Sequence, residues 1–323
     1  MIAALAGCGS ADWCVKYGKN AVSLKIYSYY VNTVYRQLAD SRQIDPEASL
    51  SDQKIGDKSA KSYIYDAALE KVLYLCELTN RFEAAGLKID GEMEKSLKTA
   101  AENEYLNGKE LFDKMGVDAD TVYEAGTSGK LGYMQQALFN SIYNTEGSKA
   151  VPDEEINTFF SENYVSYSYL YQKLTDEDGN PLDDAAKKAF KKELNDIVDK
   201  VKAGTLDIDD AANAYAQAYQ EDNTCGKNGI ATTTSSAADT EIIRRARALA
   251  PDEVVYLEIG DYAFVLQRHD LSKTQYAVDN RYSILVEMKM DEFTGEIMQA
   301  AQSAEYKVNE KNMKSAVSDL NKK

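Results

Sequence analysis

Three tyrosines at every second position are the residues whose spacing first suggests a binding site. Tyr167, Tyr169 and Tyr171 alternate with serine and leucine, and a period of two predicts a β-strand with the three rings on one face. Such a row could line an apolar pocket, because a tyrosine ring combines apolar area with a polar tip. It could equally be ordinary packing on one face of a sheet, and the pattern alone leaves both interpretations open.

The other reactive side chains give weaker signals. The single histidine, His269, disfavours histidine-based zinc sites and mechanisms that need two histidines, and we expect it to be an exposed residue at a strand end. Cys14, Cys76 and Cys225 lack CxxC spacing. The sequence allows a Cys14–Cys76 disulfide but does not require one, and buried or free thiols are expected. The sequence contains no phosphate loop and no dinucleotide fingerprint, so we predict no cofactor and no metal.

The first residues are similar to a bacterial lipobox, in which small residues precede a cysteine that becomes lipidated. The segment is Leu5-Ala6-Gly7-Cys8, and the apolar residues before it would end a signal-peptide core. The stretch lacks a preceding Lys or Arg and is short for a full signal, so we expect a trimmed or misassigned start. The alternative is a random run of small residues. Lipidation of Cys8 would tether the chain to a membrane surface, with its folded part outside the cytoplasm.

Composition limits the remaining classes. The chain has 323 residues, which predicts two domains. Its net charge of −16 disfavours a nucleic-acid-binding role, because phosphate neutralisation needs clustered Lys and Arg. Hydrophobic residues make up 44%, an ordinary share for a globular protein. Proline is scarce, with four residues, as in a mostly helical chain.

The elements that must position these residues follow from periodicity. Apolar residues recur every three or four positions through most of the first half and again after Leu271, which predicts amphipathic helices. Those of the first half are expected at 24–38, with Ser23 as N-cap, and at 58–85, 89–115 and 122–143. The segment between these helical parts predicts strands at 164–171, 254–257 and 262–267, helices at 183–202, 208–219 and 241–250, and a loop at 222–236.

We therefore predict an α+β fold, in which a mostly helical module formed by the N- and C-terminal segments carries an inserted α/β domain. The expected segments are a signal remnant and linker at 1–13, a helical domain at 14–163, the α/β domain at 164–271, and C-terminal helices at 272–323 that pack on the helical domain.

Four segments in a fixed order carry a resemblance to a known family. The chain resembles the extracytoplasmic parvulin-type foldases, the group of PrsA lipoproteins and SurA, which are peptidyl-prolyl cis-trans isomerases and chaperones. The residues that carry it are the lipobox, Val15–Ser23 as the opening of a helical chaperone domain, Val151–Ile156 as the helix that leads into a parvulin domain, and Ala248–Val254 with Gly260–Val265 as its closing helix and hairpin.

The resemblance implies a pocket that lowers the barrier to X–Pro rotation, about 18–20 kcal/mol, by favouring the twisted amide. Family members that isomerise prolines carry one histidine in the first strand and one in the last. These positions fall here on Tyr169, or Ser168 with a shift of one residue, and on Ala263. The family's Cys or Asp before a glycine-rich loop falls on Asp222 or Cys225. Both histidines are replaced, so the resemblance implies weak or lost isomerase activity.

The same resemblance implies unfolded or partly folded exported polypeptides as partners, a membrane surface reached through the lipid anchor, and no nucleic acid. Tyr29 falls off the apolar face of its helix, so we expect it to be exposed and able to bind such clients. The alternative is a non-catalytic surface lipoprotein, or an adhesive or structural binding protein that reuses the fold. The sequence assigns no oligomeric state.

Overall fold

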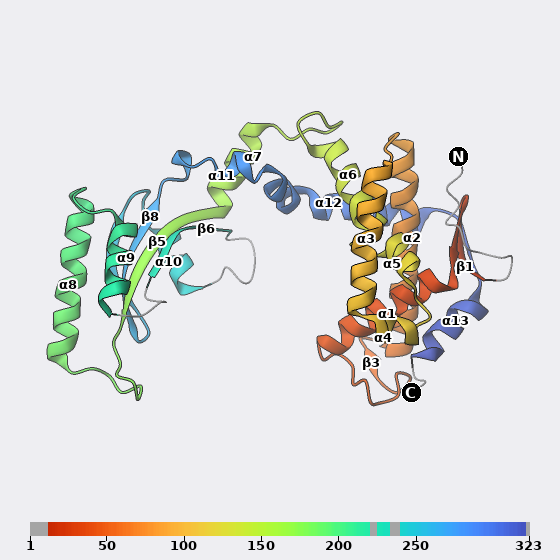
Figure 1. Ribbon diagram of the computed structural model, residues 1–323, viewed down its shortest axis with the longest axis horizontal. Coiled ribbons are helices and arrows are strands. Elements are labelled where there is room, and N and C mark those ends of the chain that lie inside the picture. Colours follow the sequence, from red (N-terminus) through yellow and green to blue (C-terminus); the bar gives the residue numbers. More distant parts are fainter. Residues whose placement is uncertain (1–11, 220–224, 233–239, 321–323) are drawn as a thin grey trace. The chain divides into compact units, whose positions relative to one another are not determined.

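The computed structural model describes residues 12–219, 225–232 and 240–320. The chain divides into two compact units, one formed by residues 1–150 with 286–323 and the other by 151–285. Helices dominate the first unit, and a four-stranded sheet organises the second (Figure 1). The predicted fold class is confirmed, because both ends of the chain build the helical module and an α/β unit is inserted between them.

Helices α1 (Leu24–Asp40) and α2 (Ala60–Ala84) form the centre of the first unit. Ser23 caps α1 as predicted, since its hydroxyl accepts a hydrogen bond from the Ile26 backbone N–H. Gly86 follows the end of α2 with a φ of +72°, a left-handed conformation that glycine adopts without strain. A small hairpin, β3 (Lys54–Ile55) and β4 (Lys58–Ser59), lies between the two helices, so α2 begins two residues after the predicted start at 58.

Two segments that were predicted as single helices are each divided in two. The first is α3 (Gly91–Asn107) and α4 (Lys109–Lys114), and the second is α5 (Ala119–Ala125) and α6 (Lys130–Tyr143). The first break lies at Gly108, where a Cβ atom would come within 2.8 Å of the Phe112 ring. A larger residue at this break would therefore have to displace the Phe112 ring.

The C-terminal segment completes the core of the first unit. Helix α12 (Arg281–Ser303) crosses the boundary between the units, and its Phe293 ring lies 5.5 Å from that of Phe139 on α6, edge to face. Helix α13 (Glu310–Asp319) contacts α1 and α2. The strands β1 (Trp13–Tyr17), β2 (Asn20–Ser23) and β9 (Tyr306–Val308) form an antiparallel sheet in the order β2-β1-β9.

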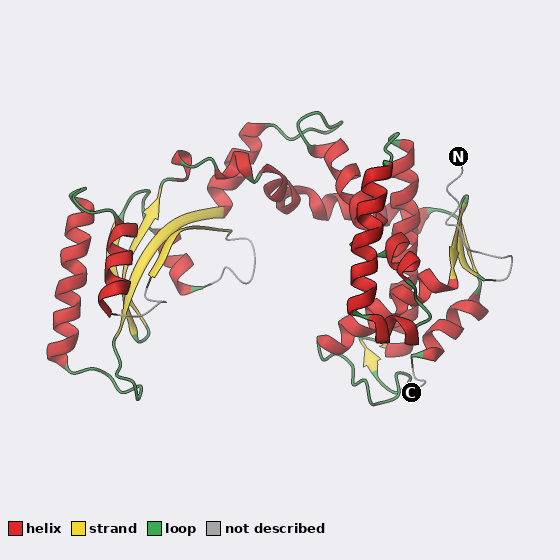
Figure 2. Cartoon of the chain, viewed as in Figure 1, coloured by secondary structure: helices red, strands yellow, loops and turns green. Residues whose placement is uncertain are grey.

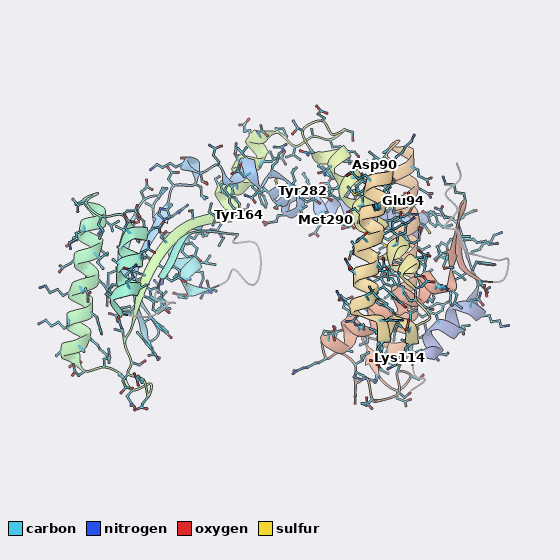
Figure 3. All side chains as sticks on the ribbon, in the orientation of Figure 1. Asp90, Glu94, Lys114, Tyr164, Tyr282 and Met290 are labelled. Carbon is cyan, nitrogen blue, oxygen red and sulfur yellow. The ribbon has the colours of Figure 1, made fainter. Side chains whose placement is uncertain are left out.

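The second unit begins at Val151 and ends at Leu285, so it extends beyond the predicted 164–271 segment on both sides. Its first helix, α7 (Asp153–Asn163), leads directly into β5 (Tyr164–Lys173), and Figure 3 labels Tyr164 at this junction. The short helix α11 (Tyr276–Asp279) packs on α7, where the rings of Phe160 and Tyr276 stack at 5.6 Å. Aromatic contacts therefore hold the flanking segments to the sheet unit.

The sheet of the second unit has the order β6-β5-β8-β7, and all neighbouring strands are antiparallel (Figure 2). Its other elements are α8 (Asp184–Lys202), α9 (Ile208–Tyr219), β6 (Cys225–Thr232), α10 (Glu241–Ala248), β7 (Val254–Ile259) and β8 (Tyr262–His269).

Strand β6 is a correction to the sequence analysis, which expected a loop at 222–236. Pairing with β5 along the sheet edge supplies the backbone hydrogen bonds that the local sequence does not predict. None of the helices among the described residues is both long and apolar enough to cross a membrane.

Candidate functional site

The two faces of the four-stranded sheet pack against different helices. One face, with Leu170 and Val265, packs on α8 and α9. The other face, with Val165 and Leu266, packs on α10 through Ile243, and Figure 1 shows α10 on the side of the sheet away from α8 and α9. Successive side chains of a strand point to opposite faces, so the tyrosines at odd positions of β5 lie on the α10 face.

Five rings form a continuous cluster on that face, which we call the aromatic row: Tyr167, Tyr169, Tyr171, Tyr262 and Phe264. Along β5 the Tyr167 and Tyr169 rings stack at 6.1 Å, and the Tyr169 and Tyr171 rings at 6.3 Å. Across the strands, Phe264 lies 6.1 Å from Tyr169 and 5.6 Å from Tyr171, and Tyr262 lies 5.3 Å from Tyr171. These distances are those of favourable aromatic pairs.

The aromatic row is only partly covered. Val165 and Leu266, under α10, are fully buried, whereas Tyr169 and Phe264 are half-buried and Tyr262 at the far end is 38% exposed. Beside β5, the residues of β6 that pair with Tyr167 and Tyr169 are Gly229 and Gly226. A glycine has no side chain to cover the neighbouring ring, so the row keeps an accessible apolar surface.

The tyrosine hydroxyls give this apolar surface polar tips. Within the described residues, the hydroxyls of Tyr167 and Tyr169 make no hydrogen bond to another residue. Burial, reinforced by the neighbouring Tyr169, raises the pKa of Tyr167 above its ordinary value. The phenol therefore stays protonated at neutral pH and can donate to a carbonyl oxygen of a bound chain.

The structure separates two of the residues that the family resemblance brought together. Tyr169 lies on the α10 face, but Ala263 is 0% exposed and faces α8 and α9. Tyr169 pairs with Leu266, and Gln172 with Ala263, so Phe264 is the β8 residue beside the Tyr169 ring. The prediction that Ala263 shares a pocket with Tyr169 is wrong. The two residues lie on opposite faces of the sheet, because a shift of one position along a strand moves a side chain to the other face.

Ser168 and His269 do not join the aromatic row. Ser168 is fully buried on the opposite face, where its hydroxyl lies 2.8 Å from Nε2 of His269. His269 is half-buried, not an exposed strand-end residue as predicted. Asp222 and Cys8 lie outside the described residues. The Ser168–His269 contact was missed because the two residues lie far apart in sequence and meet only through strand pairing.

The prediction that Tyr29 is exposed is wrong. Tyr29 is 9% exposed, its ring stacks on Phe112, and burial raises its pKa to about 12. Helix α4 supplies Phe112 and covers this side of α1, which the helical period of α1 alone does not reveal. Tyr29 is therefore a core residue and does not offer a client-binding surface.

The structure describes both cysteines of the Cys14–Cys76 disulfide that the sequence allowed. Cys14 and Cys76 are both fully buried, and no disulfide joins them. Burial raises the pKa of the Cys76 thiol to about 12, so it stays protonated and unreactive. The expectation of buried or free thiols is confirmed for these two residues.

Comparisons with known proteins give structural neighbours only. No family model and no curated protein matches the chain. The foldase protein PrsA from Streptococcus pneumoniae is 14% identical, with 84% of this chain and 98% of that chain covered and a TM-score of 0.37. The peptidylprolyl isomerase (PrsA) from Bacillus cereus is 12% identical, with 97% and 100% covered and a TM-score of 0.35.

Proposed function

We propose that this chain is an extracytoplasmic, membrane-anchored folding factor that holds unfolded or partly folded exported polypeptides, with the aromatic row as a peptide-binding surface. The observation that carries the proposal is the row itself. Its rings cluster on one face of a sheet, yet glycines flank them on β6 and Tyr262 reaches solvent.

The chemistry of the row suits an extended apolar segment. A large aromatic side chain offers about 150–250 Å² of surface, and adjacent rings lie 5.3–6.3 Å apart. Extended residues advance about 3.3 Å each, so alternate side chains of a client fall near successive rings. The hydroxyls of Tyr167 and Tyr169 supply donors for the backbone carbonyls of such a client.

Catalysis of proline isomerisation by this unit is proposed to be weak or absent. Phe264, which lies beside Tyr169, has no hydrogen-bond donor to stabilise a twisted amide. The single histidine of the chain lies on the opposite face, against Ser168. Loss of one preorganised donor costs about 10²–10³ in rate at electrostatic sites, whereas holding a client needs only apolar area.

Membrane anchoring through Cys8 belongs to the same proposal and has its own test. Mass spectrometry of protein from the native membrane is expected to find Cys8 as a lipid-modified N-terminal residue. An unmodified Cys8 within a longer N-terminus would rule out the anchor and leave the peptide-binding proposal standing.

The test of the function compares two aromatic-to-alanine changes on opposite faces of the sheet. The double variant Tyr169→Ala/Phe264→Ala of the full chain is expected to lose most of its ability to suppress aggregation of an unfolded client. The matched control is Tyr256→Ala, because Tyr256 is a partly buried β7 residue that packs with the α8 and α9 face. Equal suppression by the wild type and the double variant would overturn the binding role of the row.

A protease-coupled assay with a proline peptide completes the test. Little or no acceleration over the uncatalysed rate is expected from the wild-type chain. Rapid catalysis that is abolished by Tyr169→Ala would show an active isomerase. If the wild-type chain neither suppresses aggregation nor accelerates isomerisation, the results would favour a surface protein that reuses the fold for adhesion.

A further inference from the structure

The outer face of the small sheet β2-β1-β9 carries an unusual pair of lysines. Val15 and Tyr17 of β1 are buried, so the alternation of the strand turns Lys16 to the solvent side. Lys16 lies directly opposite Lys307 in the β1–β9 register. The Lys16 ammonium lies 4.5 Å from the ring centroid of Trp13, so the two lysines and the indole share one exposed surface, which we call the basic face.

The lysine pair has no neutralising partner among the described residues. Like charges directly opposite each other destabilise a sheet. Within the described part of the chain, no carboxylate lies within ion-pair distance of Lys16 or Lys307, whereas Lys25 and Lys58 bind Asp118 and Asp66, each at 2.5 Å. Two ammonium groups on facing residues of one sheet, with no carboxylate of the described chain between them, leave a local positive charge that an external anion can neutralise.

A hollow adjoins the pair and could receive such an anion. It has a volume of about 540 Å³ and is lined by Lys16, Gly18, Ala304, Glu305, Tyr306 and Lys307. Tyr306 is 40% exposed there, and Glu305 is the single carboxylate of the lining. Two ammonium groups can hold a phosphate group, and Glu305 limits the site to ligands that direct their anionic part towards the lysines.

We propose that the basic face docks on the anionic phospholipid headgroups of the membrane that anchors the chain. This inference rests on the proposed anchoring through Cys8. Cys8 precedes Trp13 by five positions, and a fully extended chain spans at most about 3.6 Å per residue. A lipid on Cys8 would therefore hold Trp13 within about 18 Å of the bilayer surface.

The residues of the basic face match the chemistry of a membrane interface. The indole ring of a tryptophan is favoured at headgroup level, because one end of the ring is apolar and the other polar. Each lysine near an anionic surface adds an attraction that falls off within a Debye length. The rest of this acidic chain is repelled by the same surface, so the basic face orients the anchored protein.

The experiment uses the full chain, tethered independently of lipidation so that failure of the anchor does not affect it. An N-terminal hexahistidine tag holds the protein on vesicles that contain a nickel-chelating lipid. Trp13 is the single tryptophan of the chain, so its fluorescence reports the basic face alone. Quenching by bromine-labelled acyl chains is expected on vesicles rich in phosphatidylglycerol and not on phosphatidylcholine vesicles, and it is expected to disappear in about 0.5 M NaCl.

Two variants and a control identify the residues responsible. Lys16→Gln/Lys307→Gln is expected to lower the ratio of docked to free protein about thirty-fold. Lys307→Gln alone leaves the lysine over the indole in place and is expected to lower it about five-fold. The matched control is Lys88→Gln/Lys95→Gln, an equal loss of charge at exposed positions of the same unit, and it is expected to leave quenching unchanged.

Three outcomes would overturn the proposal. The first is equal quenching on the two kinds of vesicle. The second is quenching that survives Lys16→Gln/Lys307→Gln. The third is a change in Trp13 fluorescence on adding inorganic phosphate or an acidic peptide in solution, with none on vesicles, because that would assign the face to a soluble anion. Lipid modification of Cys8 is measured separately, so its failure is distinguishable from each of these.

Discussion

Replacing Ala263 or Phe264 with histidine tests which of the two residues lies on the face of the aromatic row. Ala263 is fully buried among Leu170 and Val265, and its strand partner Gln172 accepts a hydrogen bond from Tyr215 at 3.0 Å. An imidazole at this position must overpack the core, at a cost of about 1–3 kcal/mol. An unpaired buried ring nitrogen adds about 1–3 kcal/mol. We therefore expect Ala263→His to destabilise the sheet unit by about 2–6 kcal/mol.

Phe264→His is expected to cost much less. Phe264 is half-buried on the aromatic row, so an imidazole keeps a ring in the same place and its nitrogens remain hydrated. A loss of about 1 kcal/mol follows from the apolar area that the smaller ring gives up.

Urea unfolding followed by the near-ultraviolet circular dichroism of the tyrosines measures both variants. Trp13 belongs to the other unit, so its fluorescence transition is the internal control and should not move. Destabilisation by Phe264→His equal to or larger than that by Ala263→His would refute the assignment of faces. A protein that tolerates both changes would refute the packing argument itself.

Three further outcomes are expected. Phe293→Ala removes a core ring of the helical unit and should lower its unfolding free energy by about 3–5 kcal/mol, seen as an earlier Trp13 fluorescence transition; no shift would contradict the role of α12 in that core. Burial raises the pKa of Asp118, but hydrogen bonds, chiefly from Lys25, outweigh it and lower the pKa to about 2. Stability from this partly exposed group, about 1 kcal/mol after solvent screening, is therefore present above pH 4 and lost as the pH falls towards 2, and Asp118→Asn should flatten that dependence. Cys76 should resist alkylation in the folded chain at about pH 8 and react on unfolding, as peptide mass mapping can measure; labelling as fast as that of a free thiol would be inconsistent with its burial.

The sequence by itself determined most of the helices and three of the four strands of the larger sheet. Periodicity placed β5, β7, β8 and the helices between them, since each has a regular apolar face. Ser23 marked the start of α1 through local backbone chemistry. These features depend on neighbours within a few residues, so they can be read from the chain directly.

Tertiary structure decided which of the resulting side chains meet. Strand β6 exists because β5 pairs with it, although its own residues predict a loop. Tyr29 is buried by Phe112 from another helix, and Ser168 meets His269 across two strands. None of these contacts has a local signature, because each joins segments that only the fold brings together.

The candidate site shows the same division. The sequence placed Tyr167, Tyr169 and Tyr171 on one face, because a strand alternates every residue whatever its partner. The resemblance assigned Ala263 to the pocket of Tyr169, whereas Phe264 lies beside that ring, because the neighbour depends on the register between β5 and β8. Register is fixed by how well both faces of the sheet are buried. Here the small Ala263 fits the closed core against α8 and α9, and Phe264 extends the aromatic row.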